Sequence, residues 1–149
     1  MAEVDLLQAE ADALLAMPKL RVDDTEWTFP PERGSVSIPL VSKDKREKFA
    51  LDLSQGRINT LRIKYQNRAR QVVTLARLEL AGPMHWNPDG QEISCPHLHI
   101  YREGYGDKWA FPVSKDAFPN IADGWLTLHD FMRFCTVARP PRFFRGLFP

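Results

Sequence analysis

Six short segments between residues 35 and 113 alternate apolar and polar residues, and this period of two is the strongest constraint on the fold. Side chains two residues apart lie on the same face of a β-strand, so an alternating segment buries one face and exposes the other. Turn sequences such as NPDG (residues 87–90) and EGYG (residues 103–106) separate neighbouring segments. Short connections favour antiparallel neighbours, so we expect an antiparallel sheet of about six strands over residues 35–113.

Helical spacing of apolar residues is confined to the two ends of the chain. Residues 1–17 predict an N-terminal helix, because leucines recur at helical spacing until Pro18. Residues 126–137 predict a second helix with one apolar stripe, and residues 138–149 predict an irregular tail. A chain of 149 residues has the length of one domain, so we expect a single-domain α+β protein.

Composition and charge exclude several classes of protein. The apolar fraction of 44% and the charged fraction of 26% are those of a globular protein. No apolar run approaches the roughly 20 residues of a membrane span, so we expect no membrane partner. Two cysteines, Cys95 and Cys135, are too few for a disulfide framework, and no signal peptide is visible. A cytoplasmic location is therefore the expectation.

A basic run at residues 57–77 contains no aspartate or glutamate, although the chain has 19 acidic residues. Clustered cations attract phosphates through charge-assisted hydrogen bonds and counterion release. We therefore predict a nucleic-acid surface on this run; besides Arg57, its cations are Arg62, Lys64, Arg68, Arg70 and Arg77. The alternative is a solvated strand face on which lysine and arginine protect a sheet edge.

The segment CPHLHI places Cys95, His97 and His99 at every second position, on one face of a predicted strand. Imidazoles exchange protons near neutral pH, because their ordinary pKa is about 6.5. One hypothesis is therefore a small, toxin-like, metal-independent ribonuclease without a cofactor, in which His97 and His99 are acid and base. Lys108 and Arg102 would stabilise the phosphate charge. Strict alternation places Arg102 on the opposite face, unless the following turn rotates it.

The same histidines also suit a metal. Two imidazoles at alternate positions of a strand can chelate Zn or Fe, and His85 and Cys95 would complete a ligand set with His97 and His99. The spacing from His97 to Glu103 also resembles the first metal motif of the cupins, but the glycine expected before it is displaced by one position and no second motif follows. A third interpretation is structural, with the imidazoles packed under the NPDG loop and bonded to carbonyls.

The turn at residues 103–107 adds an aromatic candidate. Its glycines suit a tight hairpin, and Tyr105 between them could stack on a base. If the strand face that carries the histidines and cations does not catalyse a reaction, we expect it to be a docking surface for nucleic acid, with RNA favoured. It could equally dock on a protein partner in a nucleic-acid-processing complex, such as a nuclease that the chain inhibits. The hypotheses differ in one test: His97→Ala would abolish cleavage by an enzyme, but would only adjust the affinity of a binding protein.

Three segments carry a resemblance to a family. They are QAEADALLAMPK (residues 8–19), INTLRIKYQNRAR (residues 58–70) and GPMHWNPDGQEISCPHLHIYREGYGDKWAFP (residues 82–112), the last of which contains the CPHLHIYREGYGDKW block. Together they resemble an uncharacterised family of small bacterial proteins with a domain of unknown function. The resemblance covers roughly residues 6–135. It implies a bacterial, cytoplasmic protein, and it implies no established activity and no catalytic residues.

Overall fold

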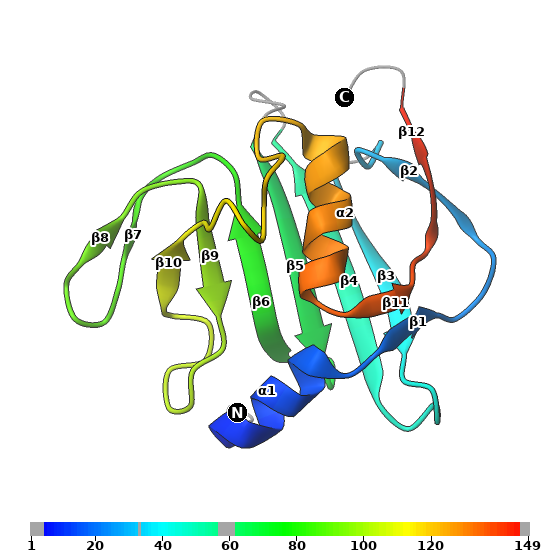
Figure 1. Ribbon diagram of the computed structural model, residues 1–149, viewed down its shortest axis with the longest axis horizontal. Helices are drawn as coiled ribbons and strands as arrows, with labels where there is room; N and C mark the ends of the chain where they lie inside the picture. The colour runs from blue at the N-terminus through cyan, green and yellow to red at the C-terminus, as the bar shows by residue number, and fades with distance from the viewer. Residues whose placement is uncertain (1–4, 33, 57–61, 147–149) are drawn as a thin grey trace.

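The structure, a computed structural model, describes residues 5–32, 34–56 and 62–146, and most of this part of the chain is built around one large sheet (Figure 1). The strands of the main sheet are β1 (Lys19–Arg21), β3 (Ser35–Val41), β4 (Lys48–Gln55), β5 (Ile63–Ala69), β6 (Val73–Glu79), β9 (His97–Ile100), β10 (Ala110–Pro112) and β11 (Val137–Arg139). Across the sheet their order is β10-β9-β6-β5-β4-β3-β1-β11. Within this sheet, in the described residues, β1 and β11 pair in parallel and all other neighbours are antiparallel.

Two smaller sheets flank the main one. A hairpin joins β7 (His85–Trp86) to β8 (Glu92–Ile93) through the expected NPDG turn, which the Gly90 amide closes by donating to the Asn87 carbonyl at 2.8 Å. Near the C-terminus, β12 (Arg142–Arg145) pairs in parallel with β2 (Glu26–Phe29). Figure 1 shows the β7–β8 hairpin beyond β9 and β10, and the β2–β12 pair on the other side of the molecule.

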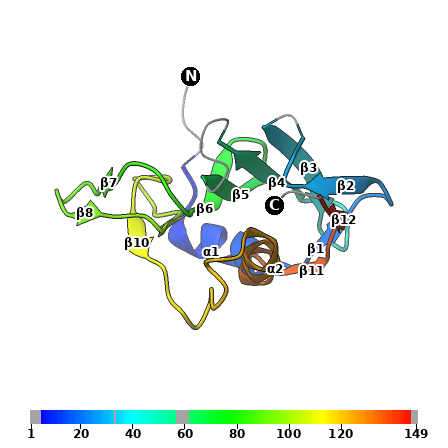
Figure 2. The same cartoon turned by 90° about the horizontal axis from the view of Figure 1, so that it is seen from above.

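Both helices, α1 (Gln8–Ala16) and α2 (Gly124–Phe134), lie on the same side of the main sheet (Figure 2). Asp123 caps the start of α2, where its carboxylate accepts from the Leu126 amide at 3.0 Å. Neither helix is long and apolar enough to cross a bilayer, and this holds for the described part of the chain.

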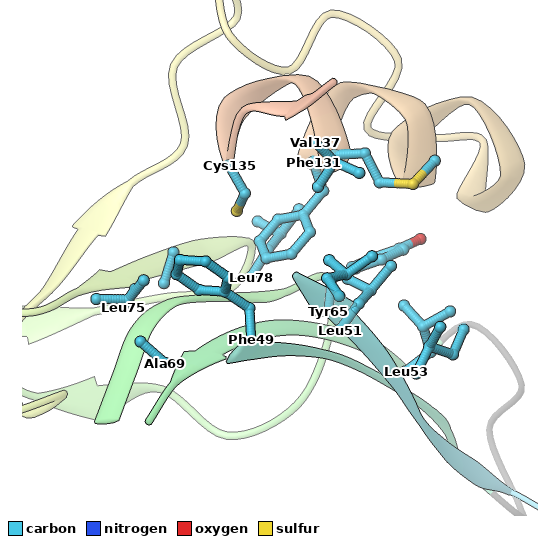
Figure 3. Packing of buried hydrophobic residues seen from close by; sticks show 14 of the residues in the cluster. Phe49, Leu51, Leu53, Tyr65, Ala69, Leu75, Leu78, Phe131, Cys135 and Val137 are labelled. Atoms are coloured by element: carbon cyan, nitrogen blue, oxygen red, sulfur yellow. The ribbon is translucent and has the colours of Figure 1, made fainter. Parts of the chain in front are cut away.

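The core lies between α2 and the inner face of the sheet (Figure 3). Alternation on β5 buries Ile63 and Tyr65 and leaves Lys64 between them on the outer face. The ring of Tyr65 packs against Phe131 of α2 at 5.7 Å between centroids, and its hydroxyl donates to the Gly124 carbonyl at 2.8 Å. The period of two therefore sorts each central strand into an apolar inner row and a polar outer row.

The α+β class and the antiparallel centre of the sheet agree with the expectation from sequence, but the details differ. The main sheet has eight strands rather than about six, and it begins at Lys19 rather than at residue 35. The tail predicted to be irregular contributes β11, which extends the main sheet, and β12. The first helix begins at Gln8, so the predicted residues 5–7 are not helical, and predicted residues 1–4 lie outside the described part of the chain; the second helix covers residues 124–134 rather than 126–137. The parallel partners β1 and β11 are far apart in the sequence, so no short turn marks them as a pair of strands.

Candidate functional site

A polar group occupies the outer face of the sheet where β6 lies beside β9. Arg77 and Glu79 of β6 are in register with His99 and His97 of β9, respectively. The residue between each pair, Leu78 or Leu98, belongs to the core, so the four polar side chains point away from the helices. Side chains directly opposite on neighbouring strands lie about 5 Å apart at Cβ, and they therefore interact as one group.

His97 has an acceptor oxygen on each ring nitrogen. Nδ1 lies 3.1 Å from the Ile93 carbonyl oxygen, and Nε2 lies 2.8 Å from Oε2 of Glu79. A carbonyl only accepts, so Nδ1 must carry the proton in this contact. In a neutral imidazole the lone pair of Nε2 would then face a carboxylate oxygen. The lone pairs of Nε2 and Oε2 repel each other in this arrangement. A proton or another cation between the two atoms removes the repulsion.

His99 has a simpler arrangement. Its Nδ1 donates to the Asp107 carbonyl at 2.8 Å, which leaves a lone pair on Nε2. Burial and, secondarily, the charge of Arg77 lower the pKa of His99 to about 4, so the ring is neutral at neutral pH. Sequence alternation placed both histidines on an open face, but His97 and His99 are only 0% and 2% exposed.

Glu79 joins the histidines to two cations. Its Oε1 lies 3.2 Å from Nε of Arg77 and 3.6 Å from Nζ of Lys64, while Oε2 faces His97. Burial alone would raise the pKa of Glu79, but the hydrogen bond to His97 and the two cations lower it below its usual value. The carboxylate is therefore ionised at neutral pH, with one oxygen fixed toward the cations and the other toward the imidazole.

The β7–β8 hairpin supplies a third imidazole, which packs edge-on against the other two. The ring of His85 lies 4.6 Å from that of His99 and 6.0 Å from that of His97, measured between centroids. Asn87 fastens the hairpin to the edge strand β10: its Oδ1 accepts from the Ala110 amide at 2.8 Å, and its Nδ2 donates to the Ala110 carbonyl at 2.9 Å. This side-chain amide pairs with the strand as a backbone peptide would.

Cys95, one of the metal-ligand candidates from sequence, lies against the ring of His97. Its sulfur does not join the ligand atoms of the other candidates. Its sulfur is 3.6 Å from Nδ1 and 3.9 Å from Nε2 of His97. Burial, with a smaller effect of the Glu79 charge, raises the pKa of Cys95, so the thiol keeps its proton at neutral pH.

The donor atoms that converge best come from Glu79, His97 and His99. One ligand atom from each lies within 4.8 Å of the others, and in the described residues no other set of three such side chains does so. The set therefore contains two of the four metal-ligand candidates predicted from sequence, and Glu79 replaces His85 and Cys95.

A groove of about 590 Å³ runs over the outer face next to this group. Glu79, Arg77 and Lys64 line one part of it. The remaining lining is mainly hydroxyl and amide side chains from β3, β4 and β5, namely Ser35, Ser37, Ser54 and Gln66, together with Asp52. A small polar molecule in the groove would therefore contact Glu79 directly.

Two predicted catalytic cations lie outside the hydrogen-bonded group of His97, His99 and Glu79. Arg102 stacks on the ring of Trp109, with its guanidinium carbon 4.4 Å from the centroid. The side chain of Lys108 is exposed, and it is the Lys108 carbonyl that contacts His85, accepting from Nε2 at 2.7 Å. Arg77 and Lys64 are the cations beside Glu79 instead.

The basic run is neutralised by acids from neighbouring parts of the fold. Its ion pairs are Lys64–Glu79 at 3.6 Å, Arg68–Asp52, Arg70–Glu47 at 2.9 Å and Arg77–Asp107. Arg62 is exposed beside Gly82, and Arg57 lies outside the described residues. Residues 57–77 contain no acidic residue, but in the fold acidic side chains from other segments lie beside their cations.

Three further aromatic or acidic candidates also have other roles. Tyr105 is 43% exposed and packs edge-on against Trp109 at 5.7 Å, on the glycine-containing turn that the sequence predicts. Tyr101 lies two positions after His99 on the same alternating segment, but it is buried in the core and its hydroxyl donates to the Leu6 carbonyl at 2.9 Å. Glu103 accepts from the Gln8 amide at 2.7 Å, so the cupin-like spacing does not deliver it to the histidines.

Comparison with known proteins gives a family and no activity. The model of a family of unknown function, DUF6978, matches residues 6–137, and the chain belongs to that family. No curated protein and no solved structure matches the chain.

Proposed function

We propose that this member of the DUF6978 family binds a divalent transition metal of the zinc and iron class through Glu79, His97 and His99. The observation that carries the proposal is the orientation of the imidazoles, because Nδ1 of each faces a backbone carbonyl. Metal-binding histidines donate their second N–H to such an acceptor, which fixes the tautomer and aims the other nitrogen at the metal.

The donor set fits this class of metal. Two imidazoles and one carboxylate hold catalytic zinc and non-haem iron in proteins, with metal–ligand distances of about 2.0–2.2 Å. Ligand atoms around such an ion lie about 3 Å apart, and the present separations of up to 4.8 Å require a side-chain adjustment of about 1.5 Å. A cation between Nε2 of His97 and Oε2 of Glu79 also removes the repulsion between their lone pairs.

The cations beside Glu79 affect how tightly the site would bind a metal. Arg77 and Lys64 oppose a second positive charge, so we expect an affinity weaker than that of structural zinc sites. Three protein ligands leave at least one coordination position open, and the groove beside Glu79 is the route to it. The metal would then polarise a bound water or a small polar ligand.

A Co²⁺ titration of the wild type, a ligand variant and a control variant tests the proposal. We expect the metal-free wild-type protein to develop visible absorption with one equivalent of Co²⁺, because Co²⁺ in a site of low symmetry absorbs in that region. Glu79→Gln keeps the shape of the side chain and removes its charge, and it should weaken binding at least about tenfold. His129→Ala is the matched control, because His129 is an exposed histidine on α2.

Two results would overturn the proposal. One is a wild-type protein without a Co²⁺ spectrum at millimolar metal. The other is equal binding by wild type and Glu79→Gln. Loss of binding only in His85→Ala would move the site to the β7–β8 hairpin and would also contradict the ligand set.

Proton transfer is the second candidate, and the Glu79–His97 contact of 2.8 Å favours it specifically. A proton on Nε2 removes the repulsion of lone pairs as a metal would, and it creates an imidazolium beside the neutral His99. This pair could act as acid and base on RNA, with Arg77 and Lys64 in place of the cations predicted from sequence.

RNA cleavage in the presence of a chelator separates the two candidates. A metal-independent ribonuclease keeps its activity in EDTA and loses it in His99→Ala, while His129→Ala remains active. Cleavage that requires added Zn²⁺ or Fe²⁺, or an absence of cleavage, would count against proton transfer as the function of the site.

A further inference from the structure

A second pocket lies at the opposite edge of the main sheet from the histidines, where β1, β11 and the β3–β4 turn meet (Figure 1). Its volume is about 430 Å³. We call it the basic pocket, because five of its nine lining residues are cations, namely Arg21, Lys43, Lys45, Lys48 and Arg139. We propose that the basic pocket binds the phosphate groups of single-stranded nucleic acid.

Both acids of the β3–β4 turn are occupied elsewhere. The sequence of the turn, KDKREK, contains four cations and two acids. However, Asp44 accepts from the Ser42 hydroxyl at 2.7 Å and from the Arg46 amide at 3.0 Å, so it stabilises the turn itself. Glu47 pairs with Arg70 at the end of β5, at 2.9 Å. The lysines of the turn are therefore left without a carboxylate partner in the described residues.

The turn also holds its lysines in a fixed arrangement. The Ser42 amide donates to the Glu47 carbonyl at 3.0 Å, the Lys45 amide donates to Ser42, and the Glu47 amide donates to the Ser42 hydroxyl. Lys43 and Lys45 therefore extend from a closed turn and Lys48 from the first position of β4, so the backbone that carries these lysines is already ordered and less entropy is lost when a ligand binds.

Two distant strands complete the pocket with arginines. Arg21 of β1 donates to the Pro140 carbonyl at 3.1 Å and pairs with Asp24 at 3.3 Å, so its charge is partly compensated. Arg139 of β11 is exposed and has no ion pair in the described part of the chain. The basic pocket and the basic run differ in how many of their cations form ion pairs. Four cations of the basic run have an acidic partner, whereas in the described residues only Arg21 among the five cations of the basic pocket has one.

The chemistry of the pocket selects phosphate. Lysine and arginine are the side chains that bind phosphate oxygens, and converging uncompensated cations gain most from a multiply charged anion. The concave shape admits a protruding phosphate, which a flat bilayer surface does not offer. A flexible single strand can present consecutive phosphates to a recess of this size.

Binding of a labelled single-stranded RNA of about 20 nucleotides tests the proposal, using fluorescence anisotropy and the full chain without a tag. Lys43→Gln/Lys48→Gln removes two cations of the pocket. The matched control, Lys115→Gln/Arg142→Gln, removes two exposed cations elsewhere and changes the net charge equally. We expect Lys43→Gln/Lys48→Gln to weaken binding at least about tenfold at 50 mM salt and to reduce the salt slope by about 1.4.

Equal weakening by both double variants would overturn the proposal, because only net charge would then matter. So would an absence of RNA binding by the wild type at low salt. Calorimetry with inorganic pyrophosphate tests the other source of phosphate: tight binding of pyrophosphate with no RNA binding would replace nucleic acid by a small phosphorylated molecule. Retention on anionic vesicles in place of RNA would contradict the proposal as well.

Discussion

The side chain of Lys19 is fully buried, yet its ammonium group is surrounded by carbonyl oxygens. Nζ lies 2.8 Å and 2.9 Å from the carbonyl oxygens of Leu14 and Leu15, in the last turn of α1, and 2.7 Å from that of Cys135 after α2. The Leu14 carbonyl also accepts from the Met17 amide at 3.3 Å, and the partial negative charge at the end of a helix attracts cations. Burial lowers the pKa of Lys19 to about 8, so the ammonium remains mostly protonated at neutral pH.

Replacing Lys19 should therefore destabilise the fold. Lys19→Met keeps the aliphatic stem but removes the ammonium donor from the carbonyls of Leu15 and Cys135, and we expect the free energy of unfolding to fall by about 2–3 kcal/mol. Urea denaturation measures the change, and exposed Lys115→Met should stay within about 0.5 kcal/mol of wild type. An unchanged midpoint for Lys19→Met would show that the carbonyls find other partners.

The sequence gives no indication that Lys19 has this role. The lysine follows Pro18 at the end of a predicted helix, where a cation is ordinary. One of its partners is the carbonyl of Cys135, 116 residues away along the chain. Contacts at such a separation depend on how the helices meet over the sheet, and neither composition nor spacing encodes them locally.

Among the elements, the β7–β8 hairpin connects the fold to the site. It is held at the sheet edge by the two hydrogen bonds between Asn87 and the backbone of Ala110, and it places His85 against His99. Trp86, on the same hairpin, is 58% exposed, whereas Ile93 of β8 is buried, so the hairpin buries less apolar surface than a central strand such as β5. The hairpin should therefore open locally at a lower free energy than the central strands.

Removal of the Asn87 side chain tests this attachment. In Asn87→Ala the amide of Ala110 loses its acceptor, and we expect its hydrogen exchange to accelerate at least about tenfold while amides of β5 keep their protection. Mass-spectrometric exchange on peptic fragments resolves the two regions. Asn120→Ala, which removes an amide elsewhere, is the control; equal exchange of Ala110 in all three proteins would contradict the assigned attachment.

The elements divide into those that alternation predicts and those that it does not. The strands β3, β4, β5, β6, β9 and β10 fall within the six alternating segments of the sequence. In contrast, β1 and β11 have three residues each and pair across 118 positions, from Lys19 to Val137. The strand β10 is equally short, but the EGYG turn joins its segment to that of β9, whereas β1 and β11 become neighbours only through a contact that is distant in the sequence.

At the scale of the whole molecule, charge is balanced across strands rather than along the sequence. On the outer face, Asp52 of β4 accepts from Nη2 of Arg68 at 2.9 Å and from Gln66 at 2.8 Å. Burial raises the pKa of Asp52, but hydrogen bonds from Arg68, Gln66 and Ser37 outweigh it and lower the pKa below the usual 3.8. The ionised carboxylate therefore stabilises the fold at neutral pH.

This pKa shift predicts an acid-dependent loss of stability. Between the usual pKa of 3.8 and the lower folded value, the unfolded chain binds the proton first, so the free energy of unfolding falls as the pH falls. We expect Asp52→Asn to destabilise the protein by about 1–2 kcal/mol at pH 7, and the difference from wild type to shrink below about pH 4. Urea midpoints at the two pH values measure this.

Exposed Asp116→Asn should leave the pH dependence of stability unchanged. A difference between wild type and Asp52→Asn that persists at low pH would show that the cost arises from packing rather than from the charge.

The candidate site could be predicted in part. Alternation correctly put His97 and His99 on one strand face, and it also directed Arg77 and Glu79 outward on theirs. The missing information was that β6 lies beside β9 in the register that aligns Glu79 with His97, because the sequence does not specify which strands pair. The same lack of information made the basic run look unpaired, since its acids are on other elements.

The central claim is that Glu79, His97 and His99 bind a metal, and the most direct measurement is the metal content of tag-free protein by elemental mass spectrometry. Wild type and the control His129→Ala should contain close to one Zn or Fe per chain. Glu79→Gln and His99→Ala, confirmed to be folded by circular dichroism, should contain substantially less. Wild-type protein without metal, or equal metal in Glu79→Gln, would contradict the claim.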